Sequence, residues 1–112
     1  MRSDDERLRD ILEAIAAIKR HATDDLDRYQ RDEPLRWFFR AQVQIIGEAC
    51  FKLSEAVRDS HPEVPWRAIT GMRHILVHDY FEADWDVLWE TLQTHVELLR
   101  AQIASIVERR SA

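Results

Sequence analysis

The sequence predicts an all-α fold, an antiparallel bundle of four to five helices that forms a single domain over residues 1–112. Apolar residues recur at intervals of three and four along most of the chain, which is the period of an amphipathic helix. Only two glycines and three prolines occur, so turns are few and the regular elements are long. No segment alternates apolar and polar residues over a useful length, as a half-buried strand would.

The first helix is expected from a Ser3 cap to about Ala22. Glu6 stands three positions after Ser3, which is the spacing of a capping box. The apolar stripe of this helix consists of Leu8, Ile11, Leu12, Ile15 and Ile18. The polar stretch "TDDLDRYQRDEP" then predicts a connection without a helix of its own.

A second, longer helix is expected from Pro34 to about Val57. Proline suits the first turn of a helix, where its missing N–H costs nothing. The apolar stripe of this helix consists of Leu35, Phe38, Phe39, Ile45, Ile46, Ala49, Leu53 and Val57. The stretch "DSHPEVPW" ends it, because two prolines in four positions cannot continue a helix.

Two further helices complete the bundle. One is expected from about Trp66 to His78. The next begins near Asp84, a plausible cap, and its apolar residues are Val87, Leu88, Leu92, Val96, Leu99, Ile103 and Val107. Four helices joined by short connections imply a bundle.

Composition narrows the class of protein. Apolar residues make up 46% and charged residues 33% of the chain, as in ordinary globular domains. No apolar run is long enough for a membrane span, and the acidic N-terminus lacks the apolar core of a signal peptide. Cys50 is the single cysteine, so it is expected to be a small core residue in a protein of the reducing cytoplasm. We therefore expect a cytoplasmic protein with no membrane partner.

The net charge of −5 is distributed unevenly. Residues 34–80 carry six basic and five acidic side chains, whereas the segments before and after them carry a net charge of −3 each. A local cationic groove on an acidic body is therefore possible, although the counts do not require one.

Several aromatic residues suggest an interface. Trp37, Phe38 and Phe39 are consecutive and cannot all face one core, and Trp85 and Trp89 form a pair four residues apart. A wide bundle could bury most of them. Because aromatic residues are enriched at interface centres, we instead expect a homodimer.

The segment "GMRHILVHDYFEADW", residues 71–85, crowds Arg73, His74, His78, Asp79 and Tyr80 around a short apolar run. One interpretation is structural, with amphipathic residues closing a helix. A second makes His74, His78 and Asp79 metal ligands. The glutamate of the zincin pattern is missing there, because Ile75 occupies its place.

A third interpretation is acid–base chemistry on a phosphodiester. A histidine titrates near neutral pH and can carry a proton, and an arginine offers a forked charge that matches phosphate oxygens. RNA contains its own nucleophile, the 2′-hydroxyl, so its cleavage requires no metal or other cofactor. One such histidine per chain is few for a reaction that needs both an acid and a base. A symmetric dimer with two motifs across one cleft would supply both.

The stretch "RHILVHDY" resembles the signature of the HEPN superfamily, an arginine, four residues, a histidine, one residue and a tyrosine. The surrounding "IIGEA" (45–49), "PEVPWRAITGMRHILVHDYF" (62–81) and "DWDVLWE" resemble the HepT-like branch, the toxin half of HepT/MntA toxin–antitoxin pairs. The resemblance covers essentially the whole chain.

This resemblance implies a dimeric HEPN-like bundle and a metal-independent endoribonuclease. Because the acidic body weakens non-specific affinity for RNA, we expect a narrow choice of substrate, such as a tRNA or an mRNA. His78 would be the acid–base residue and Arg73 the clamp on the phosphate and transition state. The implied partner is an MntA-like nucleotidyltransferase antitoxin, which in this family can transfer AMP from ATP to the motif tyrosine, here Tyr80. An AMP group there would fill the cleft with negative charge and repel RNA.

Supporting polar roles are expected for His74, Asp79 and Glu48. His74 stands where the family often has asparagine, and it could form the same hydrogen bond, carry a second proton or lie on the helix surface. Glu48 either holds Arg73 or points outward, and Gly47 beside it permits close helix packing. Asp79 could orient a histidine or the tyrosine hydroxyl, whereas His95 is expected to be structural.

The alternative function is a non-catalytic dimeric module that binds a nucleotidyltransferase partner and its nucleotide. Tyr80 would then be a docking or modification site.

Overall fold

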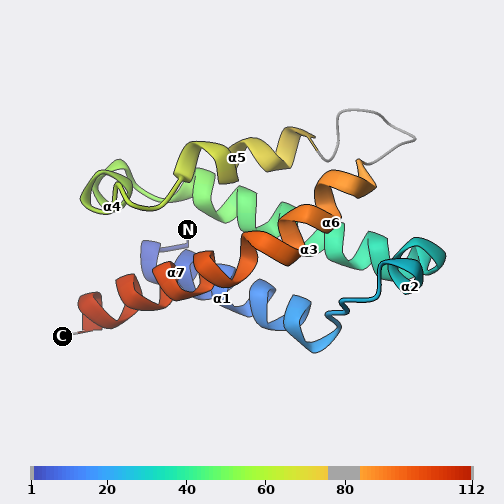
Figure 1. Ribbon diagram of the computed structural model, residues 1–112. Coiled ribbons are helices and arrows are strands. Elements are labelled where there is room, and N and C mark those ends of the chain that lie inside the picture. The colour runs from blue at the N-terminus through green and yellow to red at the C-terminus, as the bar shows by residue number, and fades with distance from the viewer. Residues whose placement is uncertain (1, 76–83, 112) are drawn as a thin grey trace.

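The computed structural model describes residues 2–75 and 84–111, except for the side chains of His74 and Ile75. These residues form seven helices and no strand, which confirms the all-α prediction, whereas the predicted number of four to five helices is too low. The helices are α1 (Asp4–Arg20), α2 (Leu26–Arg31), α3 (Glu33–Lys52), α4 (Glu55–Ser60), α5 (Trp66–Ile75), α6 (Trp85–Thr94) and α7 (Val96–Ser111). Figure 1 shows that α1, α3, α5 and the α6–α7 run reverse direction from one to the next.

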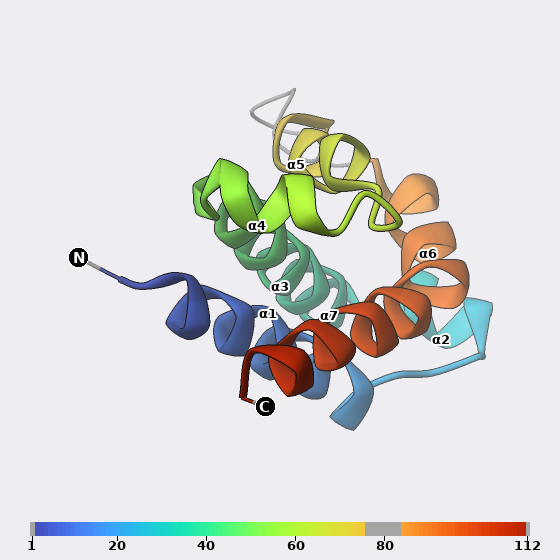
Figure 2. The same cartoon turned by 90° about the vertical axis from the view of Figure 1, so that its left-hand side faces the viewer.

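The central element of the bundle is α3. It packs against α1, α2, α5 and α6, while α7 packs against α1 and α6. In the turned view of Figure 2, α3 lies between α5 on one side and the pair α1 and α7 on the other. Any site formed by α5 or α6 therefore lies beside the long helix α3.

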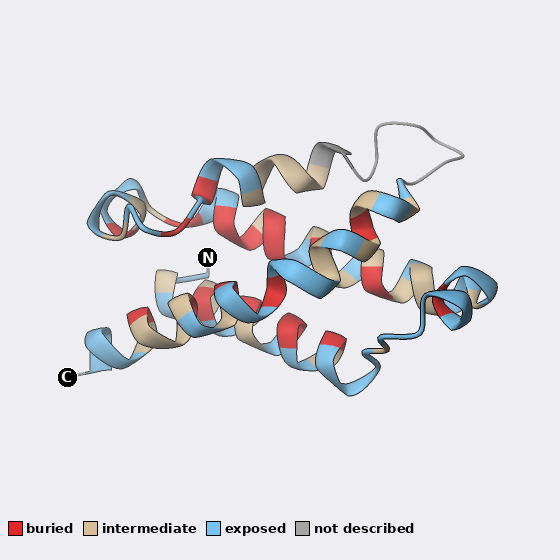
Figure 3. Ribbon diagram, in the orientation of Figure 1, coloured by how far each residue is buried: buried red, intermediate tan, exposed pale blue. Residues whose placement is uncertain are grey.

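The core is formed by apolar side chains alone within the described residues. Figure 3 shows the buried positions on the faces of the helices that are turned toward one another. Its fully enclosed members include Leu8, Ile11, Ile15, Tyr29, Phe39, Cys50, Leu88, Ile103 and Ile106. No helix in the described ranges is long and apolar enough to cross a membrane.

The segment expected to be a plain connection contains the short helix α2. The carboxylate of Asp25 caps it by accepting the backbone N–H of Arg28 at 3.1 Å. Its one buried residue, Tyr29, donates its hydroxyl to the carbonyl of Trp85 at 2.7 Å. Burial of a single aromatic ring and a cap therefore stabilise a helix that the polar sequence did not predict.

The second predicted helix is two helices. Leu53 leaves the helical conformation at the end of α3, and the Ser54 hydroxyl caps α4 by accepting the N–H of Val57. Asp4, at the start of α1, receives hydrogen bonds from both the N–H and the hydroxyl of Ser54, at 2.9 and 2.7 Å. The prediction of one continuous helix was therefore wrong. The sequence of α3 and α4 alone did not indicate the bend, because it involves Asp4, which is distant in the sequence.

The last predicted helix is interrupted at His95, which ends α6. Two threonine hydroxyls donate to carbonyls four residues earlier, Thr91 to Val87 at 2.8 Å and Thr94 to Glu90 at 2.6 Å. Such bonds compete with the helical ladder and bend helices. The apolar stripe continues across the break, which is why periodicity alone predicted one helix.

Candidate functional site

Arg73 lies in α5 where that helix packs on α3. Its guanidinium Nη1 donates to Oε2 of Glu48 at 3.2 Å, and only 18% of the Arg73 side chain is exposed. Of the two orientations that the sequence allowed for Glu48, the one toward Arg73 is therefore present. Glu48 also meets Lys52, whose Nζ lies 3.3 Å from Oε1.

Phe51 supports the same guanidinium from α3. The central carbon of the Arg73 guanidinium lies 3.6 Å from the centre of the Phe51 ring, within the range of a cation–π interaction. Phe51 is nevertheless 46% exposed. Arg73 is thus fixed by a carboxylate and an aromatic face that sit one helical turn apart.

Gly47 sets the distance between the two helices at this point. A Cβ atom on Gly47 would lie 3.2 Å from the carbonyl oxygen of Ile69 and 3.3 Å from Cβ of Arg73. These contacts are tighter than most side chains tolerate, so the close approach of α5 depends on the missing side chain. Gly47 and Glu48 are neighbours in "IIGEA", and together they place and hold Arg73.

The charge distribution favours an ionised Glu48. The hydrogen bond from Arg73 is the main cause that lowers the pKa of Glu48, and Lys52 adds to the effect. Nε of Arg73 is buried and has no hydrogen-bond partner within the part of the chain that the structure describes. The Arg73 guanidinium is therefore a cation held beside the Glu48 carboxylate, and its Nε–H donates to none of these described residues.

The structure brings together Arg73 and Glu48 among the predicted site residues. His78, Asp79 and Tyr80 lie outside the described residues, as does the side chain of His74. The predicted roles of all six, and the alternative metal site, stay predictions.

Sequence reasoning missed Phe51 and Lys52. Both lie within one turn of Glu48 on α3, at positions 51 and 52. The helical spacing of three and four residues from Gly47 and Glu48 was the available signal.

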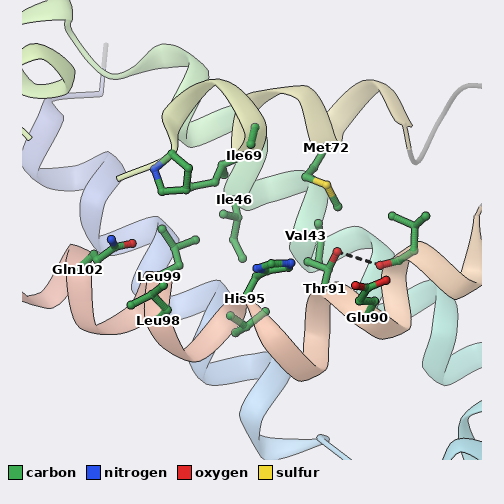
Figure 4. Close-up of a pocket in the computed structure, with 14 residues that line it drawn as sticks. Val43, Ile46, Ile69, Met72, Glu90, Thr91, His95, Leu98, Leu99 and Gln102 are labelled. Atoms are coloured by element: carbon green, nitrogen blue, oxygen red, sulfur yellow. Dashed lines mark hydrogen bonds between the residues drawn. The ribbon is translucent and has the colours of Figure 1, made fainter. Parts of the chain in front are cut away.

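A cavity of about 450 Å³ separates α5 from the α6–α7 run, with α3 at its base (Figure 4). Most of its lining is apolar, and Ile46, Ile69, Met72 and Leu99 are labelled in the close-up. His95 extends into this gap from the helix break. No arginine lines the cavity among the described residues, so it lacks the charged clamp present at Arg73.

Comparison with known proteins decides the family. The family model described as "Ribonuclease HepT-like" matches residues 11–106, which is most of the chain. The chain belongs to the HepT-like ribonuclease family. The sequence resemblance to the HepT-like branch of the HEPN superfamily is thereby confirmed.

Curated relatives agree with this HepT-like assignment. A protein named "Putative RNase" from Caldanaerobacter subterraneus subsp. tengcongensis is 35% identical over 81 residues, 72% of each chain. A "Probable ribonuclease HepT" from Thermococcus cleftensis is 31% identical over 106 residues, 94% of this chain and 96% of the relative. A "Putative RNase" from Methanocaldococcus jannaschii is 30% identical over 97 residues, 86% of this chain and 89% of the relative. No solved structure matches this HepT-like chain significantly.

Proposed function

We propose that this chain is a metal-independent endoribonuclease and the toxin of a toxin–antitoxin pair. One observation carries the proposal, the mostly buried Arg73 guanidinium held between Glu48 and Phe51. An arginine fixed in this way can bind the oxygens of a phosphodiester without losing further side-chain freedom. The family membership supports an RNA substrate.

The reaction proceeds by attack of the RNA 2′-oxygen on the adjacent phosphorus. The bond between phosphorus and the 5′-oxygen breaks, which leaves a 2′,3′-cyclic phosphate and a free 5′-hydroxyl. His78 accepts the proton of the 2′-hydroxyl or donates one to the leaving 5′-oxygen. Arg73 stabilises the negative charge that develops on the non-bridging oxygens.

Glu48 acts through Arg73 as a positioning residue. Its carboxylate restricts the guanidinium, and the hydrogen bond from Arg73 lowers its pKa, so it stays ionised to a lower pH than a free glutamate. His74 and Asp79 complete the polar surroundings, His74 as a hydrogen-bonding partner or second proton carrier and Asp79 as an orienting carboxylate. These two roles rest on the motif spacing in the sequence.

Two copies of the chain form the working unit. Each motif contributes one His78, and a homodimer with facing motifs provides both an acid and a base. Ile45 and Phe51, which are 44% and 46% exposed, lie on either side of Glu48 on α3. Large exposed apolar side chains beside the charged site support an interface there.

The neutralising partner is an MntA-like nucleotidyltransferase antitoxin that transfers AMP to Tyr80. Tyr80 stands two residues after His78, so a phosphate-bearing group on it would place negative charge in the RNA site. Coexpression with such a partner should add the mass of one AMP per chain. Replacing Tyr80 by phenylalanine should abolish both the added mass and the neutralisation.

The central test is cleavage of labelled tRNA and mRNA by purified protein in excess EDTA. Wild type should cut and leave cyclic-phosphate ends, whereas Arg73→Ala and His78→Ala should be inactive while remaining folded. If all three are inactive in protein whose intact mass shows no AMP on Tyr80, the nuclease proposal fails. The non-catalytic module that binds a nucleotidyltransferase would then be the better account.

A further inference from the structure

Two stacked cation–ring pairs meet at the N-terminal half of α3, where three of the residues lie on α3 and the fourth, Trp85, begins α6. The guanidinium of Arg40 stands 5.2 Å from the centre of the Trp37 ring, and that of Arg36 stands 5.2 Å from the centre of the Trp85 ring. The two indoles meet edge to face, with centres 5.0 Å apart and an interplanar angle of 87°. We define these four residues, Arg40, Trp37, Trp85 and Arg36, as the aromatic ladder.

The inner part of the aromatic ladder is fixed to the core. The carbonyl of Trp85 accepts the hydroxyl of buried Tyr29. Arg36 donates through Nη1 to the carbonyls of Tyr29, at 2.9 Å, and of Gln30. Trp85 and Arg36 therefore form a rigid support on which Trp37 rests.

The outer part is open to solvent. Trp37 is 40% exposed, whereas Phe39 two positions later is only 1% exposed. The bundle thus leaves an indole on its surface although the neighbouring aromatic is fully enclosed. A rigid exposed indole beside a guanidinium is the arrangement on which single-stranded nucleic acids stack their bases.

The position of Trp37 relates it to the candidate site. Trp37 and Glu48, the partner of Arg73, are eleven residues apart on α3. At 100° and 1.5 Å per residue they share one face, within about 20°, and are separated by about 16 Å along the axis. A short single strand can span that distance, so one strand can reach both places.

We propose that the aromatic ladder is a nucleobase subsite, in which a base of single-stranded RNA stacks on Trp37 while Arg73 holds the scissile phosphate. The proposal rests on the ribonuclease function proposed above and adds a second point of contact. Arg40 contributes positive charge beside the stacked base, where the RNA backbone is negative. The fixed spacing along α3 then selects which phosphodiester bond lies at Arg73, counted from the stacked base.

The test measures binding separately from cleavage. The probe is a fluorescent 2′-O-methyl RNA of about ten nucleotides, a length typical of single-strand sites, which lacks the nucleophile and cannot be cut. Trp37→Leu should raise its Kd at least about fivefold, the lower end of what loss of one aromatic stack produces. Trp37→Phe, which keeps an aromatic face, should stay within about twofold of wild type, and so should Leu98→Ala, an exposed apolar control on α7.

A strand with abasic positions distinguishes stacking from a structural effect. Without bases, wild type and Trp37→Leu should bind with equal Kd. A difference that persists on the abasic strand overturns the subsite, and so does an unchanged Kd for Trp37→Leu on the complete strand. A change of molar mass in light scattering would assign Trp37 to a protein interface and also overturn it.

The outcomes also separate this subsite from the proposed nuclease. If wild type cleaves RNA and Trp37→Leu binds the probe with an unchanged Kd, only the subsite is rejected. Binding that depends on Trp37 without any cleavage rejects the nuclease alone. Failure of wild type to bind the complete strand rejects the subsite directly.

Discussion

The two sides of α3 are built on different principles. Toward α1 the buried side chains are all apolar, and α1 alone contributes five of them, Leu8, Ile11, Ala14, Ile15 and Ile18. Toward α5 the contact contains a glycine, a half-exposed carboxylate and a mostly buried arginine, Gly47, Glu48 and Arg73. Beside that second contact lies the cavity between α5 and the α6–α7 run.

This difference suggests that the α1 side of α3 supplies most of the stability, whereas the α5 side holds the candidate site. Apolar burial is the main source of folding free energy, so the α1 side should dominate the free energy of unfolding. A charged pair near the surface contributes little to stability, so the α5 side can be tuned for a ligand at small cost. Mutations on the two sides should therefore affect different measurements.

The largest change in stability is expected on the α1 side. Ile15 is fully enclosed, and Ile15→Ala removes buried methyl groups and leaves a cavity. The free energy of unfolding should fall by about 2–5 kcal/mol, measured by urea denaturation at fixed protein concentration. Cleavage per folded molecule should be unchanged. A loss below about 1 kcal/mol would show that the α1 side is not the main source of stability.

The glycine at the α5 contact offers a test with an internal control. Gly47→Ala places a Cβ against the backbone of Ile69, which cannot move aside as a side chain can. Overpacking costs about 1–3 kcal/mol, more than the gain of about 0.5–1 kcal/mol from replacing a helical glycine. We expect lower stability and a larger loss of RNA cleavage, because Arg73 is displaced.

Gly71→Ala is the matched control on α5. A Cβ on Gly71 meets nothing within 4 Å, so this variant should be stabilised by about 0.5–1 kcal/mol and keep its cleavage rate. Equal unfolding free energies for the two alanine variants would show that Gly47 does not determine the position of Arg73.

The hydrogen bonds between Asp4 and Ser54, on the α1 side of α3, should contribute stability that depends on pH. Burial acts to raise the pKa of Asp4, but the hydrogen bonds from the N–H and hydroxyl of Ser54 outweigh it and lower the pKa. A lowered folded-state pKa contributes stability above the unfolded pKa of about 4, and this contribution is lost as the pH falls through the folded value. Asp4→Ala should lose about 1–2 kcal/mol at neutral pH.

Urea denaturation of wild type and Asp4→Ala from neutral to acidic pH checks this prediction. The difference between the two proteins should shrink below about pH 4. A difference that stays constant over the whole pH range would mean that the charge of Asp4 does not contribute to the stability of its contact with Ser54.

The smallest change in stability is expected at Glu48. The Glu48 side chain is 45% exposed, so Glu48→Gln should change the free energy of unfolding by less than about 1 kcal/mol. The same variant should lower kcat several-fold, because Arg73 loses its charged partner. Lys52→Gln leaves the contact between Glu48 and Arg73 in place and should cleave at nearly the wild-type rate. Equal kcat values for the two glutamine variants would contradict a positioning role for Glu48.

Local signals predicted the helices well where neighbours in sequence decide them. The capping box of Ser3 and Glu6 is present at the start of α1. The consecutive aromatics also divided as expected, with Phe39 enclosed and Trp37 at the surface. In the first case the deciding contacts span three residues, and in the second the helical period places Trp37 and Phe39 on different faces of α3.

The remaining features depend on residues distant in the sequence. The bend between α3 and α4 involves Asp4, which lies fifty residues before Ser54. The contact between Glu48 and Arg73 requires α5 to lie on α3, so periodicity within α3 could not choose the orientation of Glu48. Phe51 belongs to the site only because the fold brings Arg73 across its ring.

The buried cysteine makes the protein convenient for labelling. Cys50 is fully enclosed, and burial raises the pKa of its thiol to about 12, so almost no reactive thiolate is present at neutral pH. A cysteine introduced at an exposed position such as Ala41 would react with a spin label or dye while the native thiol stays intact. The association of two copies of the chain can thus be tested by distance measurements in spectroscopy without first removing Cys50.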